Sequence, residues 1–191
     1  MIIALNGLPN SGKDTVGKII QYLTRDKTIC NFFYNIVTLE EGLNKIRNSN
    51  VEVTWQVKKF SKLPNKLYKK ITGVDYLKLP RVDKERERPL FIKFCESMKH
   101  VFGTDVWASS LLKDYNKDCL WVITDLRFNA EYDELFLYTK VLLVHITSPN
   151  SIDNGVEDEL SDVKWDYEIV NDGSLEDLVN KVQSMLNQFN I

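Results

Sequence analysis

The sequence predicts an α/β domain in which helices flank a mostly parallel, five-stranded sheet. Segments with strand signals alternate along the chain with segments of helical periodicity, which is the order typical of a parallel sheet. In addition, 120–124 and 141–146 are continuously apolar, as expected of strands covered on both faces. The 191 residues are enough for one domain of ordinary size.

Each element has its own local signal. Strands are expected at 2–6, from 51 to about 60, and at 120–124, 141–146 and 167–170. Helices are expected at 12–25, 38–48, 62–72, 89–102, 104–115 and 129–139, and from 174 onward. Residues 29–36 are also rich in β-forming side chains, whereas 74–88 show no clear period.

Punctuating residues predict several helix boundaries. Pro89 and Gly103 are the expected start and stop of the helix between them, because proline suits the first turn and glycine the position after the last. Thr104 and Ser174 are the expected N-caps of the following helix and of the last one.

Composition excludes several classes of protein. With 25 Lys and Arg against 27 Asp and Glu, the net charge is −2, which argues against a globally basic nucleic-acid binder. No run approaches 18 apolar residues, and the N-terminus lacks the pattern of a signal peptide. Three scattered cysteines fit a reducing compartment better than a disulfide framework. We therefore expect a cytoplasmic protein without nucleic-acid or membrane partners.

Charge is nevertheless unevenly distributed along the chain. The stretch from Lys58 to Lys70 contains six lysines and no acid, whereas acids dominate from Ser151 to the end. These stretches are either solvated faces or, in the case of the lysines, a basic rim that attracts an anionic substrate.

The segment that follows the first strand has the pattern of a phosphate-binding loop. It reads Gly7-Leu8-Pro9-Asn10-Ser11-Gly12-Lys13-Asp14-Thr15. The two glycines let the backbone approach phosphates, and successive N–H groups at the start of the next helix attract the anion. Lys13 adds a point charge for the outer phosphates. The pattern predicts ATP binding by Gly7, Asn10, Ser11, Gly12, Lys13, Asp14 and Thr15; the alternative is a glycine-rich turn.

Three residues are candidate Mg²⁺ ligands. Asp14 stands where such loops usually have Ser or Thr, so its carboxylate or the Thr15 hydroxyl could meet the ion. Asp125 ends the apolar strand 120–124, where a second acid that holds Mg²⁺ is often found. The alternative for Asp125 is a cap of the helix 129–139.

Arg127 and Glu131 follow Asp125 closely enough to reach the same crevice. An arginine can bind phosphate with two hydrogen bonds, and Glu131 could hold Arg127 or a sugar hydroxyl. The base-reading motif of a GTPase is missing from the sequence. The pattern therefore predicts a small kinase with the three-layer P-loop NTPase fold, formed by 1–191 as one domain. Residues 61–116 would be a mostly helical acceptor-binding insertion, and 148–164 a lid.

Two segments taken together resemble the deoxynucleoside monophosphate kinases of tailed bacteriophages. They are Gly12-Lys13-Asp14-Thr15 and Thr124-Asp125-Leu126-Arg127-Phe128-Asn129-Ala130-Glu131. Weaker similarity lies in Lys59-Phe60-Ser61, Ile71-Thr72-Gly73, Phe102-Gly103-Thr104-Asp105 and Asn171-Asp172-Gly173. The resemblance covers 1–20 and 58–180, and 28–50 match nothing.

The resemblance implies transfer of the ATP γ-phosphoryl group to a deoxynucleoside monophosphate, with Mg²⁺, in the cytoplasm of the host if a phage encodes the protein. It leaves the base and the oligomeric state, a homodimer included, open. Lys13, Arg127 and Asp125 would be the catalytic residues. Glu131 would line the acceptor side with Arg127.

The resemblance also implies residues for the rest of the acceptor. Its phosphate would bind an arginine ahead of the 89–102 helix, with Arg88 first choice, Arg86 second and Arg81 third; the alternative is a solvated charge run. Trp107 would stack on the base or pack in the core.

Two departures from the family pattern keep other functions open. No arginine directly follows Gly103-Thr104-Asp105, and 148–164 contain none. The ending 166–173 also resembles dephospho-coenzyme A kinase. A module that senses ATP without transferring phosphate is the third alternative.

Overall fold

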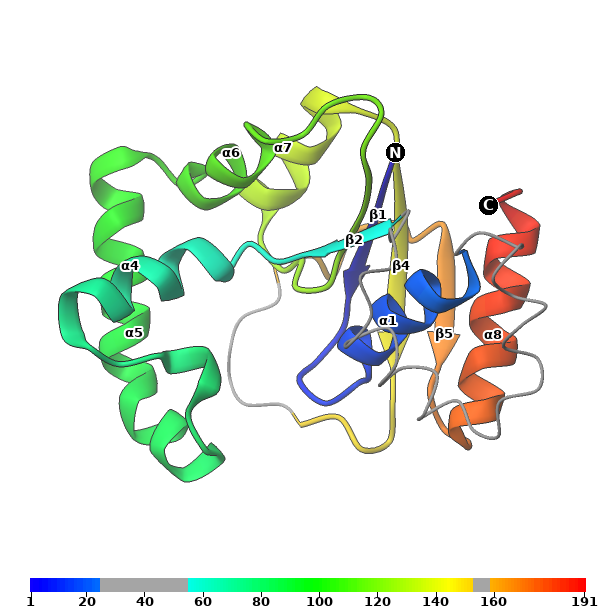
Figure 1. Ribbon diagram of the computed structural model, residues 1–191, viewed down its shortest axis with the longest axis horizontal. Helices are drawn as coiled ribbons and strands as arrows, with labels where there is room; N and C mark the ends of the chain where they lie inside the picture. Colours follow the sequence, from blue (N-terminus) through cyan, green and yellow to red (C-terminus); the bar gives the residue numbers. More distant parts are fainter. Residues whose placement is uncertain (25–54, 153–158) are drawn as a thin grey trace.

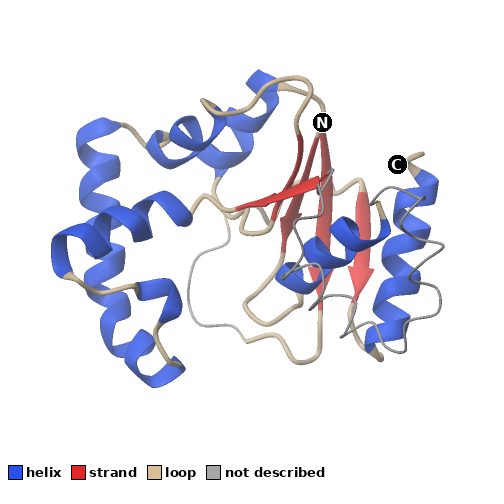
Figure 2. Cartoon of the chain, in the orientation of Figure 1, coloured by secondary structure: helices blue, strands red, loops and turns tan. Residues whose placement is uncertain are grey.

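The computed structural model describes residues 1–24, 55–152 and 159–191 and contains a five-stranded, all-parallel sheet flanked by helices (Figures 1 and 2). The strands are β1 (Ile2–Asn6), β2 (Trp55–Lys58), β3 (Leu120–Ile123), β4 (Val141–Thr147) and β5 (Tyr167–Val170). Their order is β2-β3-β1-β4-β5. The predicted α/β class and five-stranded sheet are confirmed. The elements expected at 29–36 and 38–48, and residues 51–54 of the strand expected from 51, lie outside the described residues.

The central strand β1 is completely buried, because strands pair with it on both edges and each face of the sheet carries a core. Ile3 stands in register with Val122 of β3 and with Leu142 of β4. Since side chains alternate along a strand, Ile3 and Leu5 enter the core on one face of the sheet, and Ile2 and Ala4 enter the core on the other. This explains why the segment is apolar without alternation.

Two pairs of helices cover the two faces and give the domain three layers. Helices α1 (Lys13–Leu23) and α8 (Leu175–Gln188) share one core cluster with the sheet, and α6 (Val106–Leu112) and α7 (Asn129–Tyr138) share the other (Figure 1). The predicted cap of α8 is confirmed: the Ser174 hydroxyl accepts the Asp177 N–H, and the Asp177 carboxylate accepts the Ser174 N–H.

A helical arm, residues 62–102, stands beside the sheet. It consists of α4 (Lys62–Thr72), the short 3₁₀ helix η1 (Tyr76–Lys78) and α5 (Arg81–Phe102) (Figure 1). The arm has its own small core, in which the Phe91 ring packs edge-on against Tyr68 at 5.3 Å and stacks on Tyr76 at 4.1 Å. The helical character expected of 61–116 is therefore present.

The prediction that Pro89 starts a helix is wrong. Helix α5 begins at Arg81, directly after Pro80, and Pro89 lies inside it. The error arose because the first two turns are highly charged and lack an apolar period. Ion pairs at i,i+3 spacing, Asp83 with Arg86 and Glu85 with Arg88, lie in these turns.

The next helix also differs from its prediction. Helix α6 begins at Val106 after Asp105, not after Thr104, and ends at Leu112, three residues before Tyr115.

Within the described residues, no helix combines the length and the apolar character that a membrane span requires.

Candidate functional site

The loop between β1 and α1 can be formed only with glycine at two positions. Gly7 has φ +140°, and a Cβ there would lie 2.1 Å from the Ile146 carbonyl oxygen. Gly12 has φ +104°, and a Cβ there would lie 2.5 Å from the Asn171 side chain. The predicted glycines are therefore required by close backbone approach and by left-handed backbone angles.

Neighbouring segments hold this loop in shape. The Asn171 side-chain amide donates to the Ser11 carbonyl at 2.9 Å, and the Ile152 N–H donates to the Pro9 carbonyl at 2.9 Å. Asn10 is exposed at the tip with φ 66°. The loop thus contacts residues that follow β4 and β5, as expected at the carboxyl edge of a parallel sheet.

Lys13 turns its ammonium group into the loop. The Lys13 Nζ donates to the Gly7 carbonyl at 2.6 Å and to the Leu8 carbonyl at 2.7 Å, and lies 3.4 Å from the Ser11 hydroxyl. Only 8% of Lys13 is exposed. The Lys13 ammonium is a buried positive charge beside a helix N-terminus, and it can give up its carbonyl partners for an anion. The loop is therefore suited to bind an anion.

Asp14 projects from the first turn of α1 between two strand ends. The Thr124 hydroxyl donates to Asp14 Oδ1 at 2.8 Å, and Lys59, just after β2, forms an ion pair with the carboxylate at 2.7 Å. Burial by itself would raise the pKa of Asp14, but the hydrogen bonds from Lys59 and Thr124 and the nearby charge of Lys13 lower it. The carboxylate is therefore ionised at neutral pH. Thr15 lies half-buried in the same turn.

The Asp125 carboxylate holds the base of the helical arm. It accepts the Phe60 N–H at 2.9 Å, the Ser61 N–H at 3.0 Å and the Ser61 hydroxyl at 2.6 Å. Both oxygens are thus engaged at the start of α4; the alternative prediction, a cap of α7, is wrong, whereas the Mg²⁺ contact stays a prediction. The bonds join the end of β3 to the base of the helical arm.

Glu131, and not Asp125, caps α7. Its Oε2 accepts the N–H groups of Arg127 at 2.9 Å and Phe128 at 3.2 Å. Burial raises the pKa of Glu131 to about 8; the charge of Asp125 adds to the rise, and the two N–H donors oppose it. Glu131 therefore contacts the backbone N–H of Arg127 and not its guanidinium group. This contact positions the loop that carries the arginine.

The arm contributes two cations on one side of α5. Arg88 forms two hydrogen bonds with Glu85, at 2.8 and 3.0 Å, and its side chain is 23% exposed. One turn earlier, the Lys84 ammonium lies over the Tyr76 ring, 5.3 Å from its centre. Burial lowers the pKa of Lys84, and the positive charges of Arg88 and Lys59 lower it further.

The charge of Arg127, on the loop after β3, acts on the same part of the arm. Burial raises the pKa of Tyr76, and the charges of Arg88 and Arg127 oppose this rise. We call Lys59, Lys84, Arg88 and Arg127 the cation group, because these like charges, which come from three segments, act electrostatically on Lys84 or on Tyr76 there.

Two other predicted residues lie elsewhere. The Arg86 side chain is 79% exposed and pairs with Asp83. Trp107 is 6% exposed, and its ring lies 6.4 Å from that of Phe94, as in a core residue. The indole N–H of Trp107 is buried without a hydrogen-bond partner among the described residues. Arg86 is thus a solvated residue, and Trp107 packs in the core.

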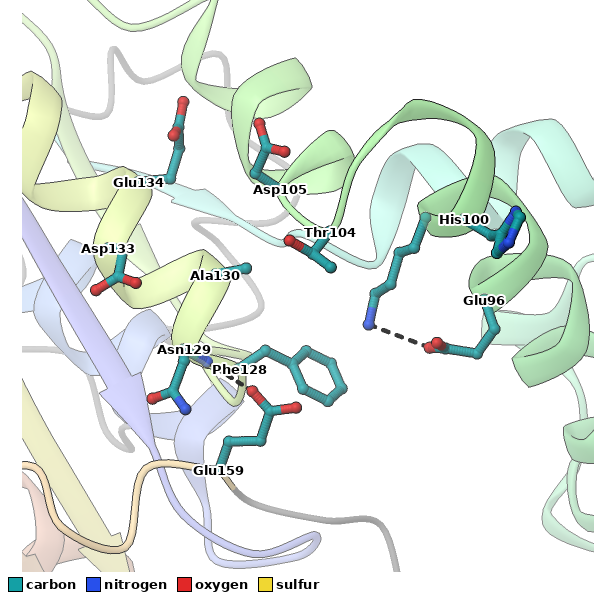
Figure 3. Close-up of a pocket in the computed structure, with 11 residues that line it drawn as sticks. Glu96, His100, Thr104, Asp105, Phe128, Asn129, Ala130, Asp133, Glu134 and Glu159 are labelled. Atoms are coloured by element: carbon teal, nitrogen blue, oxygen red, sulfur yellow. Dashed lines mark hydrogen bonds and ion pairs between the residues drawn. The ribbon is translucent and has the colours of Figure 1, made fainter.

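A pocket of about 810 Å³ opens between the end of α5 and the starts of α6 and α7 (Figure 3). Phe128, the residue after Arg127, forms part of its wall, and Lys99 lies 4.0 Å over the Phe128 ring. Lys99 pairs with Glu96 at 3.1 Å. The pocket carries five carboxylates, on Glu96, Asp105, Asp133, Glu134 and Glu159.

Sequence reasoning included Lys59 in the lysine-rich stretch and in the family resemblance, but gave it no individual role, and it missed Lys84. Lys84 belongs to a charged stretch without apolar period, and its only local signal was its position four residues before Arg88, which puts both on one helix face. Among the described residues, no three His, Cys, Asp or Glu side chains gather as a metal cluster.

No protein-family model matches the chain, and the search of curated proteins found no match.

Proposed function

We propose that the protein is a P-loop kinase that transfers the γ-phosphoryl group of ATP to a deoxynucleoside monophosphate and yields the diphosphate. The observation that carries the proposal is the buried Lys13 ammonium, which lies in a glycine loop between a parallel strand and a helix N-terminus. A separate set of cations, on the arm and after β3, supports a second phosphate site nearby. Phosphoryl transfer between two nucleotides needs both.

The loop would bind the phosphates of ATP. Its backbone N–H groups and the N-terminus of α1 would attract the β- and γ-phosphates. Lys13 would exchange the carbonyls of Gly7 and Leu8 for phosphate oxygens, which are stronger acceptors for an ammonium group.

The residues present fit a Mg²⁺ ion bound through Asp14. Its carboxylate is ionised, 59% exposed and already paired with a cation. Mg²⁺ usually takes one or two carboxylates and completes its shell with water and substrate phosphates, so a larger acidic cluster is not required. Thr15 could add its hydroxyl. When bound, the ion would neutralise charge on the β- and γ-phosphates. The Asp125 oxygens already accept the N–H groups of Phe60 and Ser61, so Asp14 is the better placed ligand.

The members of the cation group other than Lys59 would bind the phosphate of the acceptor. Arg88 and Lys84 would approach from the arm, and Arg127 from the loop after β3. The nucleoside part would extend toward the pocket beside Phe128, whose volume lies within the range of small-molecule sites. Glu131 would act indirectly, by holding the Arg127 backbone in position.

Catalysis would rest on positioning and charge neutralisation. The acceptor attacks through a phosphate oxygen, so no strong general base is needed. Residues 148–164, as a lid, and the arm would close over the two nucleotides and exclude water, because an open site would hydrolyse ATP. Since 148–164 contain no arginine, Arg127 and Arg88 would have to stabilise the charge of the transition state.

The deciding experiment measures coupled ADP release with ATP, Mg²⁺ and each of dAMP, dGMP, dCMP and dTMP, with dephospho-coenzyme A alongside. Turnover with one or more deoxynucleotides is expected. Turnover with dephospho-coenzyme A alone would move the protein to that class of kinase. ATP binding without acceptor-dependent ADP release would support the sensing module instead.

A further inference from the structure

The Lys59 ammonium stands where a metal ion would face the Asp14 carboxylate. The Lys59 Nζ lies 2.7 Å from Asp14 Oδ1 and 2.7 Å from Oδ2, so it meets both oxygens at once. On another side, the Thr124 hydroxyl fixes Oδ1 at 2.8 Å. The carboxylate is thus held in one orientation, and the place in front of it is filled by a cation of this chain.

This ion pair joins two separate elements and is open to solvent. Asp14 belongs to α1, and Lys59 follows β2, with β3 between the strands β2 and β1. The side chains are 59% and 34% exposed. Ion pairs with this exposure contribute little to stability, so the lysine can leave Asp14 without unfolding the site.

A divalent cation and the lysine cannot share this position. Two cations in front of one carboxylate repel each other. The positive charge of Lys13 already acts on Asp14, and the charges of Lys84 and Lys59 act on each other. Whichever cation is bound must therefore exclude the other.

We propose that Lys59 is a displaceable counter-cation: its ammonium neutralises Asp14 in the metal-free protein, and it gives up this place when a divalent cation binds. Lys59 is then a positioning residue that holds the Asp14 carboxylate ready and lowers the apparent affinity for the metal. The inference rests on the proposed function for the role of Asp14 as the metal ligand.

The test measures Mn²⁺ binding by the electron paramagnetic resonance signal of the free ion. ADP is added so that its phosphates can complete the metal site. The protein is kept in excess over ADP, so that almost no free ADP competes for Mn²⁺. Lys59→Met removes the charge and keeps the length of the side chain, and should bind Mn²⁺ at least about 5-fold more tightly than the wild type. Lys59→Arg keeps the charge and should bind no more tightly than the wild type.

Lys62→Met is the matched control, because Lys62 is an exposed lysine at the start of α4 and should leave Mn²⁺ affinity unchanged. Asp14→Asn should lose the site. Unchanged or weaker Mn²⁺ binding by Lys59→Met would overturn the inference. It would also be overturned if Asp14→Asn bound Mn²⁺ as tightly as the wild type. The titration needs no acceptor, so its result does not depend on phosphoryl transfer. Repeating it without ADP separates failure of metal binding from failure of nucleotide binding.

Discussion

At the scale of single residues, three carboxylates near one another have three different roles that their surroundings decide. Asp14 faces a cation, Asp125 receives the N–H groups at the base of the arm, and Glu131 receives those at the start of α7. Of the three, Asp14 is the exposed one and therefore the one most open to an incoming ion. The number of acids near a candidate site is thus a poor guide to which of them can bind a metal.

Replacing Lys13 by Met should abolish ATP binding and leave the fold intact. The ammonium group is the buried charge of the loop, whereas the methionine side chain can fill its volume. Isothermal titration calorimetry with ATP and Mg²⁺ measures the effect, and far-ultraviolet circular dichroism checks the fold. Lys62→Met serves as the control. Retained ATP affinity in Lys13→Met would remove the loop from the nucleotide site.

The stability of the protein should depend on pH through Glu131. Its pKa is raised from 4.5 to about 8 by burial and by Asp125, against the N–H donors and Lys99. Between these values the folded protein keeps a proton that the unfolded chain releases, so the free energy of unfolding falls as pH rises through this window. Each unit of pKa difference corresponds to about 1.4 kcal/mol at most.

Glu131→Gln cannot ionise and should reduce this pH dependence. Urea unfolding at pH 5.5 and pH 8.5 compares the two proteins. We expect the wild type to lose more stability than the variant over this interval. An equal loss in both would mean that Glu131 is ionised in the folded protein.

At the scale of elements, α5 decides which of its charged side chains share a face. Lys84 and Arg88 are four residues apart and share one face of the helix, whereas Arg86 lies between them in sequence and on another face. The small aromatic core of Tyr68, Tyr76 and Phe91 fixes how this face is turned. The charged run at the start of α5 therefore has one side turned toward Tyr76 and another exposed to solvent.

Arg88→Ala and Arg86→Ala should separate these two sides in kinetics. Arg88→Ala should lower kcat/KM for the acceptor about 10-fold or more, because a guanidinium that binds phosphate is lost, while KM for ATP changes little. Arg86→Ala, the matched control, should stay within about 2-fold of the wild type, since its exposed ion pair contributes little. Equal effects of the two changes would contradict the assignment.

At the scale of the whole molecule, two bodies with separate cores meet at the candidate site. The sheet domain carries the Lys13 loop and Arg127, and the arm carries Lys84 and Arg88 around its own aromatic core. Asp125 connects them by binding the N–H groups of Phe60 and Ser61. This arrangement suits an arm that moves as a unit about its base.

Binding of both nucleotides should therefore make the molecule more compact. Small-angle X-ray scattering with a non-hydrolysable ATP analogue, Mg²⁺ and the accepted deoxynucleotide should give a smaller radius of gyration than the free protein. Arg88→Ala should weaken the change, because the arm then lacks a contact with the acceptor phosphate. An unchanged radius with both nucleotides bound would show that the site is already closed.

The sequence determined those features whose physical cause is local. Strands and helices follow from apolar spacing, the cap of α8 from Ser174 and Asp177, and the loop after β1 from nine consecutive residues. The start of α5 was missed because proline is a strong local signal, whereas ion pairs between charged side chains leave no apolar period.

Tertiary structure alone decided how the charged groups are paired. Asp14 meets Thr124, 110 residues away, and Lys59, 45 residues away; Asp125 meets Ser61, 64 residues away. Such partners become neighbours only when parallel strands place their carboxyl ends along one edge of the sheet. The sequence by itself thus specified the types of side chain available, and the order of the strands selected which acid pairs with Lys59 and which ones hold the scaffold.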